Sequence, residues 1–223
     1  MKSKKIQKVL ALLLAMTMIM ASAMTVFATS DTRTPNPPTS SESGNNSGSS
    51  SSHKSSGSAY AATSKVTTST GSKITSTVSG TYAAESVPGM AFIAPAADIV
   101  SAFGITGKPY AVTSDFSGEA SPAAYVSLKH GLLVSGAKEL GPVINLNLAQ
   151  LIGGRVSEIK DNGVTTPVTL AIPASFVDGV SNYAVIRVRR GGIVDILPDL
   201  DLDPTTVTVP VTPGTGVYAM IKY

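Results

Sequence analysis

The chain has 223 residues, no cysteine and a formal net charge of +3. Four of its 17 lysines and arginines lie in the first 28 residues, whereas all 14 acidic residues lie beyond them, so the remainder has a charge of 13 − 14 = −1. Without a basic surplus, this remainder excludes nucleic acid as a partner, and without cysteine its stability has to come from a packed core.

Residues 1–28 have the layout of a secretory signal peptide. Lysines up to Lys8 precede an apolar run from Val9 to Ala28, and small residues before Ala28 or Ala23 fit a cleavage site. An uncleaved anchor is the alternative, because the run approaches the roughly 20 residues of a spanning helix. We expect a secreted or cell-wall-associated protein whose mature chain does not span the membrane.

Residues 29–59 are rich in Ser, Gly, Asn and Pro and contain no aliphatic run. Such a segment cannot bury enough apolar surface to offset the entropy lost on ordering, so it predicts a disordered linker. His53 lies within it without a second ligand at metal spacing, which indicates a solvated side chain.

Residues 60–140 alternate between strand and helix patterns. Strands are predicted at 73–78 and 90–93 from their period and β-branched content. A first helix is predicted from Pro95 to Gly104, and a second from Ser121 to Leu140. In the second helix Ser121 is the expected cap, Gly131 and Gly136 are unfavourable, and the apolar face comprises Tyr125, Leu128, Leu132 and Leu133.

Residues 141–223 are dominated by short alternating strands, expected at 143–148, 168–172, 183–189, 193–197, 207–211 and 217–221. The Gly191-Gly192 pair predicts a hairpin between two of them. Together the patterns predict one α+β domain at 60–223, mainly an antiparallel β-sandwich with two short helices and a sub-boundary near residue 140.

The late strands also carry a family resemblance. The runs 167–173, 183–188, 197–209 and 218–221 resemble the C-terminal β-domain of secreted surface proteins of Gram-positive bacteria, over roughly the last 80 residues. The chain departs from that pattern at 214–218, where it keeps Tyr218 but has no phenylalanine. A more distant similarity, at 141–143 and 167–173, is to the sandwich domain of ankyrins and netrin receptors. The resemblance implies a compartment and a fold, but no activity.

Four aspartates are the first candidates for chemistry. Asp195, Asp199, Asp201 and Asp203 place carboxylates at alternate positions, as a Ca²⁺ loop would. The loop signature is incomplete, because the position expected to hold a bidentate glutamate is Pro210. Solvated aspartates in a hairpin connection explain the same residues.

Catalytic motifs are weak. Ser135 and Lys138 have the Ser-x-x-Lys spacing but lack its partner motifs, and His130 is the one histidine that a Ser-His-Asp hydrolase could use in the folded part. The segment 104–109 has a Gly-Lys pair without phosphate-loop spacing and predicts a turn. The sequence therefore predicts no enzyme, no catalytic or metal residues and no cofactor.

Arg187, Arg189 and Arg190 form the densest basic cluster. Arg187 and Arg189 are expected on a solvated sheet face, where they could contact an anionic wall polymer or glycan. The leading functional prediction is a non-catalytic structural or binding module whose partner is a wall polymer, a glycan or another surface protein. An extracellular hydrolase using His130 or the aspartates, and a Ca²⁺-binding surface module, are the alternatives.

Overall fold

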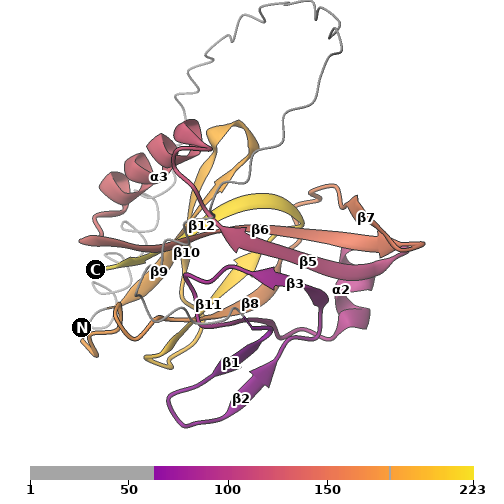
Figure 1. Cartoon of the computed structure of the whole chain (residues 1–223), viewed down its shortest axis with the longest axis horizontal. Coiled ribbons are helices and arrows are strands. Elements are labelled where there is room, and N and C mark those ends of the chain that lie inside the picture. Colours follow the sequence, from indigo (N-terminus) through magenta and orange to yellow (C-terminus); the bar gives the residue numbers. More distant parts are fainter. Residues whose placement is uncertain (1–62, 181) are drawn as a thin grey trace, which may run out of the picture. The chain divides into compact units, whose positions relative to one another are not determined.

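The computed structural model describes residues 63–180 and 182–223, which all belong to one compact unit, Lys54–Tyr223. The predicted signal peptide and linker, and His53 with them, lie outside the described residues. The described part is mainly β with two α-helices, which confirms the predicted fold class (Figure 1). Neither helix combines the length and hydropathy that crossing a bilayer requires.

A seven-stranded sheet is the largest element. Its strands follow the order β10 (Val194–Pro198), β9 (Tyr183–Arg189), β12 (Gly214–Lys222), β6 (Glu139–Ile152), β5 (Lys108–Asp115) and β3 (Ser79–Ala83), and β7 (Arg155–Glu158) pairs with β6. All pairs are antiparallel except β3 with β5. The predicted hairpin at Gly191-Gly192 joins β9 to β10 through a 3₁₀ turn, Arg190–Gly192.

Two smaller sheets complete the β-structure. One has the order β11 (Thr206–Val211), β8 (Thr166–Ala171) and β4 (Met90–Phe92), and the other is the hairpin of β1 (Lys65–Thr67) and β2 (Lys73–Thr75). The main core lies between the seven-stranded and three-stranded sheets and includes Leu146, Val185 and Met220 from the first and Phe92, Val168 and Val209 from the second. Since side chains on both sides of residue 140 enter this cluster, they share one core. The two packed sheets form the predicted sandwich.

Helix α2 (Ala96–Phe103) closes one side of this core. Ile99 and Phe103 are buried in it, whereas Val100 is partly buried against it. The helix ends at Phe103, and Gly104 follows as its left-handed cap (φ 62°), in agreement with the predicted end.

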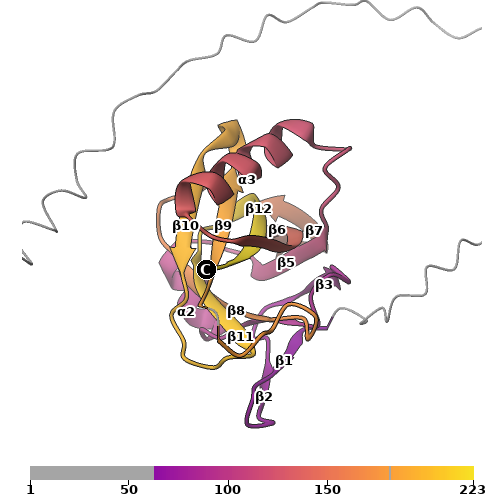
Figure 2. The same cartoon turned by 90° about the vertical axis from the view of Figure 1, so that its left-hand side faces the viewer.

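Helix α3 (Pro122–Ser135) covers the other face of the seven-stranded sheet (Figure 2). Leu128 packs there among Ala184, Ile186 and Ile221. Gly131 is also buried, and a Cβ at this position would come within 2.9 Å of the side chains of Ile186 and Val194. The glycine that weakens the helix intrinsically therefore permits the close approach of α3 to the sheet.

The predicted limits of α3 need correction. The helix ends at Ser135 rather than Leu140, because Gly136 adopts a left-handed conformation (φ 72°) and Leu140 already belongs to β6. Ser121 precedes the first turn, but its side chain makes no capping hydrogen bond. Leu133 does not join the buried face and is 81% exposed.

Four strands were not predicted: β1, β3, β5 and β7. The predicted turn at 104–109 extends only to Gly107, because Lys108 and Pro109 begin β5 and pair with β6. Pro109 lies one residue before the β5–β3 pairing starts at Tyr110, so its missing N–H interrupts no ladder on that side.

Candidate binding groove

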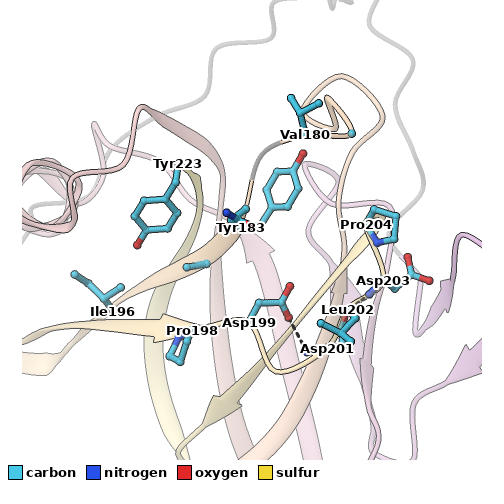
Figure 3. A pocket seen from close by; sticks show the side chains of 13 residues that line it. Val180, Tyr183, Ile196, Pro198, Asp199, Asp201, Leu202, Asp203, Pro204 and Tyr223 are labelled. Carbon is cyan, nitrogen blue, oxygen red and sulfur yellow. Dashed lines mark hydrogen bonds between the residues drawn. The ribbon is translucent and has the colours of Figure 1, made fainter. Parts of the chain in front are cut away.

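A groove of about 620 Å³ opens at one end of the sandwich (Figure 3). It lies between the connection from β10 to β11 and the segment that enters β9, with the C-terminal residue at its border. We call it the acidic groove, and it is lined by Gly179, Val180, Asn182, Tyr183, Ala184, Ile196, Pro198, Asp199, Asp201, Leu202, Asp203, Pro204 and Tyr223.

The β10–β11 connection is built from successive aspartate turns. Asp199 Oδ1 accepts the N–H groups of Asp201 (3.1 Å) and Thr208 (2.9 Å), and Asp201 Oδ1 accepts the N–H of Asp203 (2.9 Å). The hydroxyls of Thr206 and Thr208 donate to Asp201. These bonds confirm that the aspartates form turns, and they fold the loop back onto β11. The connection is not the predicted hairpin, because β10 pairs with β9 in one sheet and β11 pairs with β8 in another.

Asp203 fixes this loop to the β1–β2 hairpin. Its carboxylate accepts both the N–H and the hydroxyl of Ser69, each at 2.9 Å, and also the hydroxyl of Thr205 at 2.6 Å. The hairpin and the loop are far apart in sequence, and these bonds hold them together. The loop is thereby fixed as one wall of the groove.

The groove is electrostatically negative, since its described lining contains three carboxylates and no lysine or arginine. Burial raises the pKa of Asp199, and the nearby charge of Asp201 raises it further against the hydrogen bonds from Thr208 and Asp201. At Asp203 burial also raises the pKa, but the hydrogen bonds from Thr205 and Ser69 outweigh it, and the pKa lies below its ordinary value. A positively charged group nearby would stabilise the ionised form of Asp199 and lower its pKa.

Apolar side chains stand exposed around these carboxylates. Leu202 is fully exposed (101%) and Val180 is 87% exposed, and both line the groove. Leu200, in the same loop, is 58% exposed. Side chains of this kind lose unfavourable contact with water when a partner covers them.

The four predicted aspartates do not converge on one point. Asp195 lies on β10 and bonds to Arg187 (2.9 Å) and Arg189 (2.8 Å), away from the turn network of the other three. Within the described part of the chain, no group of three or more His, Cys, Asp or Glu side chains is arranged to hold a metal ion.

Arg187 corrects a further prediction, because it is 6% exposed rather than solvated. It points from β9 into the end of the sandwich, where Nη1 donates to the Thr212 hydroxyl (2.9 Å) and Asp195 neutralises the charge. The neighbouring Tyr218 is buried as well, which raises its pKa to about 12. Because Arg187 and Arg189 both form ion pairs with Asp195, they are not the free anion-binding pair that the sequence suggested.

The candidate catalytic residues are dispersed. His130 is exposed on α3, and no hydrogen bond or ion pair reaches it from the described residues. Ser135 Oγ donates to the Leu132 carbonyl (2.8 Å), and Lys138 lies beyond the end of the helix, so the two do not share successive helical turns. Lys222 is bonded to Glu139 (2.9 Å), which raises the pKa of the lysine and keeps it protonated rather than nucleophilic.

Comparisons with protein-family models, curated proteins and solved structures find no match to this chain. Any partner has therefore to be inferred from the surfaces of the chain itself. Sequence reasoning recognised the aspartates of the acidic groove as turn formers but not the groove itself. The available signal was the alternation of Asp and Leu from 199 to 203, which places leucines in a turn that solvent surrounds.

Proposed function

We propose that the protein is a secreted or cell-surface binding module without catalytic activity, and that its acidic groove binds a polypeptide carrying positive charge beside apolar side chains. The observation that carries this proposal is the position of fully exposed Leu202 beside the carboxylates of Asp199 and Asp201. Secretion rests on residues 1–28 and on the family resemblance.

The two parts of the groove have different roles in this proposal. Covering Leu202 and Val180 supplies most of the favourable free energy, at roughly 25 cal/mol per Å² of apolar surface removed from water. The carboxylates select the sign of the partner's charge and orient it. Loops held by a rigid sandwich commonly carry such binding surfaces.

The hydrolase alternative gains little support from the described residues. A hydrolase needs a nucleophile and a base within hydrogen-bond reach. His130 lies on the outer surface of α3, whereas the carboxylates of the acidic groove bond mainly to donors of their own loop and strand. Binding needs no such convergence of reactive groups.

Two labelled peptides that differ only in charge test the proposal, one alternating Leu with Lys and the other alternating Leu with Glu. Fluorescence anisotropy should detect binding of the Leu-Lys peptide alone, weakened by high salt. Leu202→Ala should reduce its affinity about tenfold, the equivalent of 1.4 kcal/mol. Leu133→Ala, at an exposed leucine on α3, is the matched control and should change nothing. Equal affinity for the two peptides, or equal effects of the two substitutions, would refute the proposal.

A further inference from the structure

A second groove, of about 590 Å³, has the opposite charge. We call it the basic groove, and its lining includes Lys65, Thr67, Lys73, Ile172, Val177 and Thr205. Ile172, at the end of β8, is buried and provides an apolar floor, and Val177 is half-buried beside it. The β1–β2 hairpin forms one wall.

The hairpin register places both lysines on the same face. Thr67 of β1 pairs with Lys73 of β2, and Lys65 lies two residues before Thr67, so the three side chains project together while Val66 packs inward. Both lysines are exposed, and no described carboxylate forms an ion pair with either. The described lining of the basic groove contains no acidic residue.

The two grooves lie side by side at the same end of the sandwich. Pro204 lines the acidic groove and the adjacent Thr205 lines the basic groove, so the β10–β11 loop separates them. In the other wall, Val180 belongs to the acidic groove and Val177 to the basic one. The hydrogen bonds between Ser69 and Asp203 hold the hairpin and the loop together at this boundary.

We propose that a second copy of this chain binds here, with the acidic groove and exposed loop of each copy against the basic groove of the other. Two adjacent surfaces of opposite charge can pair about a two-fold axis, because the rotation brings each onto its complement. The lysines beside Ile172 and Val177 are a cationic, partly apolar polypeptide surface of the kind proposed above as the partner. The inference therefore rests on the proposed function and identifies its partner.

Sedimentation velocity of the purified protein over about 1 to 200 µM tests this pairing, since dimers of modest affinity dissociate within that range. We expect a concentration-dependent dimer that weakens as salt rises from about 0.05 to 0.5 M. Leu202→Lys alone, and Lys65→Glu with Lys73→Glu, should each weaken it at least about tenfold, because they place like charges in contact. All three substitutions in one chain should recover part of the lost affinity, because the lysine at position 202 then meets acidic residues.

All three positions are exposed, and unchanged thermal melting of each variant verifies its fold. Leu133→Lys on α3 is the matched control and should leave the dimer intact. If Leu133→Lys dissociates it instead, or if the triple variant stays monomeric, the proposed pairing is wrong. A protein that is monomeric throughout but still binds the Leu-Lys peptide overturns the pairing and leaves the proposed function in place. If both assays fail, both inferences fall.

Discussion

At the residue scale, Arg187 carries a buried charge. It lies directly opposite Asp195 in the β9–β10 register, and Nε and Nη2 both reach the same carboxylate. Removing a charge from water is costly unless a partner and further hydrogen bonds compensate, and here Asp195 and Thr212 do so. The arginine thus fixes the pairing of an edge strand rather than presenting charge to a ligand.

Gly131 allows a residue-scale prediction. In a solvated helix Gly131→Ala would stabilise by up to about 1 kcal/mol, but here the new methyl group meets Ile186 and Val194 at 2.9 Å. Overpacking costs about 1 to 3 kcal/mol, so we expect a net loss of about 1 kcal/mol in urea unfolding. Removing the Val194 methyl groups should relieve part of this strain. Gly131→Ala with Val194→Ala should therefore cost less than the sum of the single changes, and simple additivity would contradict the packing argument.

At the element scale, the strands that could be predicted are those whose side chains alternate cleanly. The β9–β10 hairpin is the clearest case, because alternating residues flank a Gly-Gly turn. β5 was missed because Gly107 immediately before it and Pro109 near its start indicate a turn. Its identity as a strand depends on β6, to which it is paired from Lys108 to Asp115. Pairing between distant segments is a tertiary property that local patterns do not encode.

The grooves were less predictable than the strands for the same reason. The acidic groove combines the loop around Asp201, the segment near Val180 and the C-terminal Tyr223, which only the fold brings together. Arg187 was placed correctly on the face it shares with Arg189, but alternation alone does not say whether a face is solvated. Whether a face is solvated depends on what packs against it. The face of β9 that carries Arg187 packs into the end of the sandwich.

The β10–β11 loop gives an element-scale prediction about calcium. Its aspartate oxygens bond largely to donors of the loop and of β11, whereas Ca²⁺ needs six to eight oxygen ligands around one point. We therefore expect millimolar Ca²⁺ to leave the melting temperature unchanged, because only an ion that binds the folded state raises it. A rise with Ca²⁺ that Asp201→Asn abolishes would instead restore the calcium-binding interpretation.

On the scale of the whole molecule, carboxylates form polar contacts that join separate segments. Asp203 holds the β1–β2 hairpin, and Asp115 accepts the N–H groups of Glu85 (2.9 Å) and Ser86 (2.8 Å), joining the end of β5 to the loop after β3. Asp195 joins β10 to β9. Each contact is strongest when the accepting carboxylate is ionised, so the stability of the molecule depends on pH.

The direction of this dependence follows from the pKa of each carboxyl group. Burial raises the pKa of Asp115, Asp195 and Asp203, but hydrogen bonds, and at Asp195 the charges of two arginines, outweigh burial and leave all three below the ordinary value. Each therefore contributes stability that is complete above about pH 4, the ordinary aspartate pKa, and is lost as the pH falls through its folded value. Asp199, with its raised pKa, acts oppositely: its contribution is present at low pH and is lost as the pH rises through its folded value.

Three carboxyl groups lose their stabilising contribution as the pH falls, and one gains it. We therefore expect the melting temperature to fall steadily as the pH decreases from about 5 to 2.5. Asp195→Asn leaves Arg187 buried without a counter-charge and should cost about 3 kcal/mol at neutral pH. It should also flatten the acid limb, because the group whose protonation was destabilising is gone. Thermal melts of both proteins across this range measure the two effects together. A wild-type melting temperature that holds or rises towards pH 2.5 would show that these carboxylates do not govern stability, and an equally steep limb in Asp195→Asn would remove Asp195 from the explanation.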